Sequence, residues 1–157
     1  MKHAHRWIAA LVEALESEVD EEVMEKILIG CGRSCISKSF VDKARRISKE
    51  SSNLNEFLES LGEEWSHLKL ENDEVYVEYE RCFCPFVKNY PGTMSSTWCN
   101  CSRGWTKELF ETVLEKPVKV EMMSTIRQGS DICRFKVKLS RKDEIVPSYV
   151  LFEESSG

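Results

Sequence analysis

The sequence predicts an α+β domain, in which N-terminal helices pack on a small twisted antiparallel sheet made of two hairpins separated by a helix. Three observations support this fold class. Apolar residues recur at helical spacing through residues 1–62. The pattern then becomes alternating, as in strands, over parts of residues 63–157. One more helical stretch divides the alternating segments into two pairs, and helices followed by antiparallel strands are typical of α+β domains.

Two helices are predicted at the start of the chain from their apolar faces. The first has one apolar side at the spacing i, i+3, i+4 and i+7, which holds Ile8, Leu11, Val12 and Leu15. Ser17 and Asp20, three residues apart, predict a capping box that begins the second helix. The predicted buried face of this second helix holds Val23, Ile27, Leu28 and Cys31.

Two further helices are predicted from their end signals. Ser39 with Asp42 predicts the start of a third helix. Asn53 is a favourable N-cap for a fourth helix, and Glu56 completes its capping box. Gly62 is expected to end that helix, because glycine is the residue most often found just past a helix C-terminus.

The first hairpin is predicted around the turn signal Asn72-Asp73, because alternating apolar residues lie on both sides of it. A helix over residues 103–115 follows. The second hairpin turns at residues 128–131, and its return strand places Cys133 on a face with other apolar residues. An edge strand is expected at Tyr149–Phe152.

Length, composition and charge narrow the function classes. A chain of 157 residues that is 41% hydrophobic has the size of one domain, so residues 1–157 are expected to fold as one unit. The formal net charge of -5 disfavours nucleic acid as a partner. No apolar run has the length of a membrane span or the form of a signal peptide, which predicts a cytoplasmic protein with no membrane partner.

Seven cysteines are the main candidates for chemistry, because cytoplasmic thiols stay reduced. Cys31 and Cys35 lie four residues apart, on one face of a continued helix. Gly30 and Gly32 flank Cys31 and would let another backbone come close. The pair is therefore either part of a helix contact or half of a metal or redox site.

Four more cysteines form two Cys-x-Cys pairs, and one stands alone. Cys82 and Cys84 follow the second strand of the first hairpin. Cys99 and Cys101 come directly before a helix, where free backbone N–H groups lower the pKa of a thiol. Their position favours a function over simple packing. Cys133 is predicted to be a core residue of its strand.

Other candidates could bind or activate a small molecule beside the thiols. Arg33 and Arg103 each lie next to a cysteine in the sequence. Each could hold a thiolate or a substrate carboxylate, or else cap a helix or face water. Trp98 belongs to an aromatic-rich stretch that could line an apolar pocket. Among the three histidines, His67 is the plausible base.

Three stretches together resemble a known family. They are Cys84-Pro85-Phe86, Trp98-Cys99-Asn100-Cys101 before a helix, and Gly129-Ser130-Asp131-Ile132-Cys133-Arg134-Phe135 in the closing hairpin. They resemble the L-2-amino-thiazoline-4-carboxylic acid hydrolase-like family and, more distantly, vinyl-reductase-type domains. The resemblance implies an α+β domain with an apolar ligand pocket, and in some members a metal held by cysteines. Within it, Cys84, Cys101 and Cys133 match family positions and Cys99 is their neighbour.

The first functional hypothesis is a small-molecule-binding domain with one zinc ion beside an apolar, aromatic-lined pocket. Zinc suits a set rich in thiolates and poor in histidine. Its four ligands are expected first from Cys84, Cys99 and Cys101, and then from Cys31 and Cys35.

Two other hypotheses stay open. One is a hydrolase of a thiazoline or cyclic amidine ring, which uses a zinc-bound water or a cysteine thiolate while an arginine holds the substrate carboxylate. The other is an interaction or sensor domain with free thiols and no metal. A homodimer is a further prediction.

Overall fold

The computed structural model describes residues 2–88, 90 and 94–139. The helices in this part are α1 (Lys2–Glu18), α2 (Glu21–Cys35), α3 (Lys38–Glu50), α4 (Leu54–Glu64) and α5 (Asn100–Leu114). The strands are β1 (Leu68–Glu71), β2 (Glu74–Tyr79), β3 (Lys119–Ser124) and β4 (Cys133–Lys138), and two short 3-10 helices are η1 (Ser96–Cys99) and η2 (Ile126–Gln128). The edge strand predicted at Tyr149–Phe152 lies outside the described residues.

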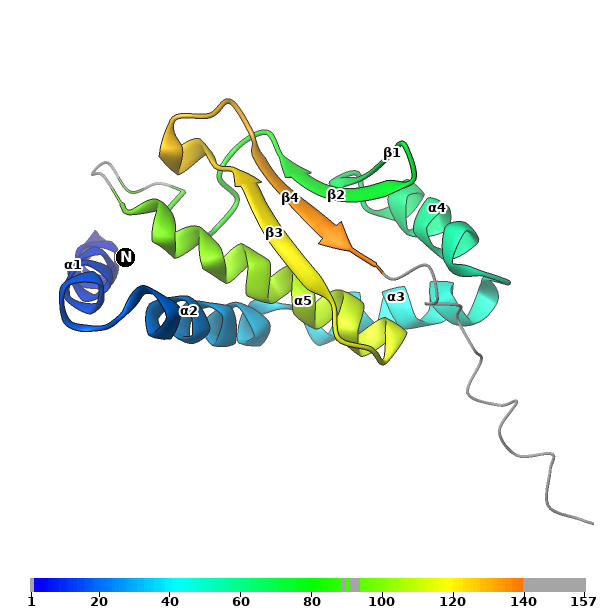
Figure 1. Cartoon of the computed structure of the whole chain (residues 1–157), viewed down its shortest axis with the longest axis horizontal. Coiled ribbons are helices and arrows are strands. Elements are labelled where there is room, and N and C mark those ends of the chain that lie inside the picture. The colour runs from blue at the N-terminus through cyan, green and yellow to red at the C-terminus, as the bar shows by residue number, and fades with distance from the viewer. Residues whose placement is uncertain (1, 89, 91–93, 140–157) are drawn as a thin grey trace, which may run out of the picture.

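The α+β prediction is confirmed. Four antiparallel strands form one sheet in the order β1-β2-β4-β3, so the two hairpins join through β2 and β4. Figure 1 shows α5 between the sheet and α2, while α1 lies at the end of the molecule where α5 begins. Among the described helices, none combines the length and the apolar character needed to cross a membrane.

Two apolar clusters fill the interior. The larger one lies between the sheet, α4 and α5, and its most deeply buried side chains include Phe57, Leu61, Leu109, Phe110 and Phe135. The smaller one joins α1 and α2 to the segment after β2, through Val12, Met24, Leu28, Val87 and Met94. Cys133 is buried in the larger cluster, as the alternation of its strand predicts. The smaller cluster borders the cysteines discussed below.

Two local signals are confirmed in detail. The Asn53 side chain accepts a hydrogen bond from the Glu56 N–H at 3.0 Å, so α4 begins where its capping residue predicts. Asn72 and Asp73 have φ values of 51° and 62°, the left-handed conformation that a two-residue hairpin turn requires and that Asn and Asp tolerate.

The predicted start of the second helix is wrong, and its predicted buried face is confirmed only at Leu28. Its N-cap is Asp20 and not Ser17. Met24, Leu28 and Gly32 are the residues buried on α2, whereas Val23 and Ile27 are 43% and 39% exposed. Cys31 is exposed as well. The buried face of α2 differs from the predicted one because α2 packs on α5 through Gly32. Glycine has no side chain, so it gives no apolar signal in the sequence pattern.

Two helix ends also differ from the prediction. The cap of α3 is Ser37, whose hydroxyl accepts a hydrogen bond from the Phe40 N–H at 3.3 Å, so Ser39 lies inside the helix. Helix α4 continues past Gly62 to Glu64, and the Trp65 N–H bonds to the Leu61 carbonyl at 2.8 Å. An interior glycine costs a helix only about 1 kcal/mol, which packing can outweigh.

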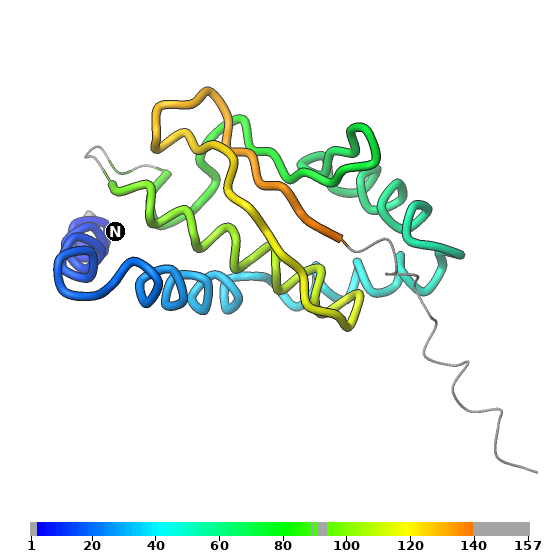
Figure 2. Tube along the Cα trace, viewed as in Figure 1, coloured from blue at the N-terminus to red at the C-terminus, as the bar shows by residue number. Residues whose placement is uncertain are grey.

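Helices α2 and α5 cross at very short range, and they run in the same direction (Figures 1 and 2). A Cβ on Gly32 would lie 1.9 Å from the carbonyl oxygen of Cys101, and a Cβ on Gly104 would lie 2.0 Å from that of Ile29. No side chain fits at either position, so the two glycines permit the contact. The close approach predicted from Gly30 and Gly32 is confirmed for Gly32 alone, since Gly30 faces open space.

Candidate functional site

The crossing of α2 and α5 brings together cysteines that are far apart in the sequence. Cys31 and Cys35 lie in the last turns of α2, and Cys101 lies in the first turn of α5, with its backbone against Gly32. Cys84 comes from the segment after β2 and, like Cys101, packs against the smaller apolar cluster. We refer to Cys31, Cys35, Cys84 and Cys101 as the four-thiol group.

The members of the four-thiol group act on one another electrostatically. Burial raises the pKa of Cys101 to about 12, and negative charge on Cys35, Cys31 and Cys84 would raise it further. The pKa of Cys35 is also raised, by burial and by the charges of Cys84 and Cys31. Cys35 and Cys101 therefore hold their protons at neutral pH as long as nothing positive lies beside them.

The remaining cysteines form a second group of Cys82, Cys99 and Cys133. Burial raises the pKa of Cys99 to about 12, and the charge of Cys133 adds to this. The sulfur of Cys133 accepts a hydrogen bond from the Ile126 N–H at 3.4 Å, and its pKa is also raised by burial. Arg127 opposes both shifts.

The predicted zinc ligands are thus divided between two places. Cys31, Cys35, Cys84 and Cys101 lie near one another, whereas the charges acting most strongly on Cys99 come from the second group. Within the part of the chain that the structure describes, which includes all seven cysteines, no three His, Cys, Asp or Glu side chains are arranged as ligands of one metal ion. The four thiols lie in the same region, but their positions in this structure are not those of a metal coordination sphere.

The two arginines proposed to bind a substrate already hold carboxylates of this chain. Arg33 Nη1 donates to Glu108 at 2.8 Å, and its Nη2 donates to Glu111. Arg103 Nη1 pairs with Glu25 at 2.7 Å. Both arginines tie α2 to α5, one on either side of the crossing. A role in substrate binding stays a prediction.

Trp98 belongs to η1 and packs against the smaller apolar cluster beside Cys82, Cys84 and Cys101. Its ring meets the ring of Phe86 edge to face, with centroids 6.5 Å apart. The Trp98 Nε1–H is buried and has no hydrogen-bond partner. Trp98 therefore packs on the same apolar cluster as Cys82, Cys84 and Cys101, and its role in binding a substrate stays a prediction.

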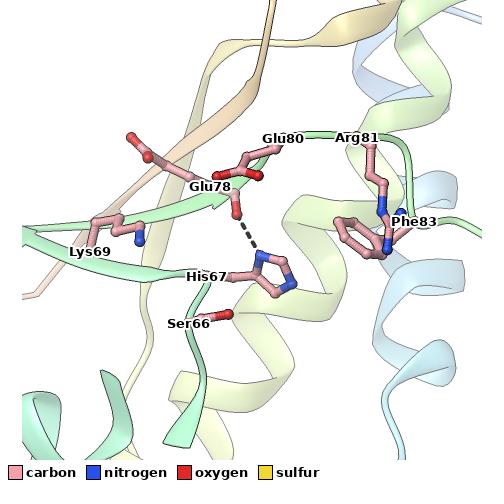
Figure 3. Close-up of a pocket in the computed structure, with 7 residues that line it drawn as sticks. All are labelled: Ser66, His67, Lys69, Glu78, Glu80, Arg81 and Phe83. Atoms are coloured by element: carbon pink, nitrogen blue, oxygen red, sulfur yellow. Dashed lines mark hydrogen bonds between the residues drawn. The ribbon is translucent and has the colours of Figure 1, made fainter. Parts of the chain in front are cut away.

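The sequence analysis missed a cavity where β1 begins and β2 ends. The cavity has a volume of about 370 Å³. Figure 3 shows its lining residues, Ser66, His67, Lys69, Glu78, Glu80, Arg81 and Phe83. These side chains come together because the strand pairing continues past Leu68, where the Glu78 N–H bonds to the His67 carbonyl at 2.8 Å. Of the residues that line this cavity, the sequence singles out His67 as a candidate base.

The fold and both cysteine groups can now be set against known families. A family model of unknown function, DUF6144, matches residues 1–144. The chain belongs to the DUF6144 family. Comparison with curated proteins and with solved structures gave no match. The match covers both hairpins, the five helices of the described residues and every cysteine. The resemblance to the thiazoline-carboxylic acid hydrolase-like family stays a prediction.

Proposed function

We propose that this DUF6144 protein is a metal-binding domain that holds one zinc ion with Cys31, Cys35, Cys84 and Cys101. The observation that carries the proposal is the close crossing of α2 and α5 at Gly32, which brings the end of one helix against the start of the other. Cys84 then supplies a ligand from a third part of the chain. Four thiolates are a common ligand set of structural zinc.

The charges in the four-thiol group support a cation as its partner. Burial and neighbouring thiolate charge raise the pKa of Cys35 and of Cys101, so these two thiols resist ionisation in the bare protein. A soft divalent cation removes this penalty, because a coordinated thiol loses its proton to the metal bond. Sulfur ligands also favour zinc over hard cations such as magnesium and calcium.

Binding requires the sulfurs to converge, and three of them are free of tight packing or regular structure that would oppose a change of rotamer or backbone. Cys31 and Cys35 are exposed at the end of α2, so their side chains can change rotamer without disturbing the core. Cys84 lies outside the helices and strands. Cys101 is anchored by the α2–α5 contact and is the fixed point of the site.

A zinc ion with four sulfur ligands has no open position, so its role would be structural. It would tie the segment after β2 to α2 and α5. That segment carries Phe83, which lines the cavity beside His67, and Phe86, which contacts Trp98. A small-molecule-binding domain whose pocket wall is held by zinc is the function that this arrangement supports best.

A zinc titration of the metal-free protein tests the proposal. We expect one zinc ion per chain, measured by competition with a chromophoric chelator. Cys84→Ser should weaken binding at least about tenfold, because it removes a direct ligand. Cys82→Ser is the matched control, since Cys82 lies two residues away but belongs to the second group. Equal zinc affinity in the two variants, or no zinc binding by the parent protein, would contradict the proposal.

The geometry of the site adds no support for the prediction that the protein is a hydrolase. A thiol nucleophile needs a lowered pKa, whereas the pKa values of Cys35, Cys99, Cys101 and Cys133 are all raised. The homodimer also stays a prediction.

A further inference from the structure

The cavity beside His67 is separate from the four-thiol group, since none of its lining residues is a cysteine. It opens between the start of β1, the end of β2 and the segment that follows. Its side chains offer hydrogen-bond donors, charges and one aromatic ring. This lining can meet a polar or charged ligand with hydrogen bonds and ion pairs, and it offers one aromatic face for stacking.

One atom of His67 is left free to meet a ligand. The ring Nδ1 lies 2.9 Å from the carbonyl oxygen of Glu78. A carbonyl oxygen can only accept, so Nδ1 carries the proton and Nε2 is the available nitrogen. In Figure 3, Nε2 points away from Glu78, toward the side of the cavity where Arg81 and Phe83 lie. The imidazole is held in place between Tyr79 and Phe83, with ring centroids 4.8 Å and 5.0 Å away.

Arg81 and Phe83 form the opposite wall. The guanidinium carbon of Arg81 lies 4.8 Å from the centroid of the Phe83 ring, which is a stacking contact between a cation and an aromatic face. Phe83 is 42% exposed, so one side of this pair is open to a ligand. A stacked guanidinium keeps its N–H groups in a fixed plane, where they can meet an oxyanion in two-pronged fashion.

The charges around the cavity favour an anion. Lys69 and Arg81 are its two cations, and Glu78 and Glu80 are its two acids. The carboxylate of Glu78 is already paired with Arg134 Nη1 at 3.0 Å. Glu80 alone therefore opposes Lys69 and Arg81.

We propose that this cavity binds a flat organic oxyanion, an aromatic ring that carries a carboxylate or a phosphate. Its ring lies against Phe83 and the edge of His67, and its anionic group meets Arg81. Nε2 of His67 bonds to a polar group on the same ligand. No residue that lines the cavity is a zinc ligand, although its Phe83 wall belongs to the segment that zinc would hold.

Binding of four probes to the full-length protein tests this proposal by ligand-observed NMR or calorimetry. Benzoate and phenyl phosphate carry a ring and an oxyanion, benzamide carries a ring without charge, and inorganic phosphate carries charge without a ring. We expect benzoate or phenyl phosphate to bind about tenfold more tightly than both of the others. The tighter of these two identifies the anionic group. Equal binding of benzamide or of inorganic phosphate would overturn the proposal, and this comparison needs no variant.

A pair of variants tests whether the probes bind in this cavity. Arg81→Gln should weaken the better probe about tenfold, because it removes the oxyanion's partner. Arg46→Gln, an exposed arginine on α3, is the matched control and should bind as the parent does. Unchanged binding by Arg81→Gln would contradict the proposal. Its zinc content should equal that of the parent, so failure here is distinct from failure of the metal site.

Discussion

At the scale of single residues, the thiols differ in how readily they ionise. Cys101 is partly buried among other thiols, and its pKa is raised to about 12. Cys31 lies in the same group but is exposed. The thiolate is the reactive form of cysteine, so two neighbours within one site should react at very different rates.

Alkylation of the metal-free protein by iodoacetamide at pH 8 tests this difference. We expect Cys101 to react at least about a hundredfold more slowly than Cys31, since both burial and its raised pKa suppress its thiolate. Peptide mass spectrometry reports each site separately. In urea all seven cysteines should react alike. Equal rates for Cys31 and Cys101 in the native protein would contradict the assigned burial and charge.

The raised pKa values also predict how stability depends on pH. Unfolded thiols lose their protons near pH 8.5, whereas Cys99 and Cys101 keep theirs in the folded protein to about pH 12. The unfolded state therefore binds fewer protons in this window, and the free energy of unfolding falls as pH rises above about 8.5.

Urea unfolding of the metal-free protein between pH 7.5 and 10 measures this loss. We expect a decrease of about 1 kcal/mol or less per pH unit for each thiol, because Cys99 is buried and Cys101 is only partly shielded from solvent. A Cys99→Ala, Cys101→Ala double variant should show a shallower decrease than the parent. The same slope in both proteins would mean that these thiols are not the cause.

At the scale of elements, the two glycines at the α2–α5 crossing set the geometry of the site. Gly32→Ala or Gly104→Ala places a methyl group on a backbone carbonyl and should lower the free energy of unfolding by about 2–3 kcal/mol. Gly30→Ala is the matched control on the same helix. It faces open space and should stabilise the protein by up to about 1 kcal/mol, because alanine favours a helix.

Chemical denaturation of the three variants distinguishes packing from helix propensity. If Gly32→Ala and Gly30→Ala were equally stabilising, the close crossing would be wrong. Zinc affinity provides a second measurement, since Gly32→Ala should also separate Cys31 and Cys35 from Cys101.

Elements with a local signal could be predicted from the sequence. The cap at Asn53 and the turn at Asn72-Asp73 depend on neighbouring residues only, and both are confirmed. The buried face of α2 depends on its partner helix, and Gly32 gives no apolar signal for it. An apolar pattern therefore predicted Val23 and Ile27 as core residues, although both are exposed.

The division of the cysteines has a similar cause. Successive residues of an α-helix are rotated by about 100° around the helix axis. Side chains two positions apart therefore point to nearly opposite sides of the helix. Cys99 and Cys101 straddle the start of α5 and therefore face different groups. The sequence shows them as a pair, and only the packing of α5 separates them.

At the scale of the whole molecule, the order of the layers decides what the site contains. Helix α5 lies between the sheet and α2, so its first turn borders both cysteine groups (Figure 1). One side of it faces Cys31 and Cys35 on α2, and the other faces Cys133 on β4. The fold class alone predicts helices on one face of the sheet, but it does not predict which thiols meet between the helices and the sheet.

The central claim is that four named thiols share one zinc ion, and cysteine footprinting tests it most directly. The metal-free protein is alkylated with and without one equivalent of zinc, and each cysteine is read by mass spectrometry. We expect zinc to protect Cys31, Cys35, Cys84 and Cys101, including the two exposed cysteines of α2, and to leave Cys82, Cys99 and Cys133 unchanged. No protection by zinc, or protection of the second group in place of the first, would contradict it.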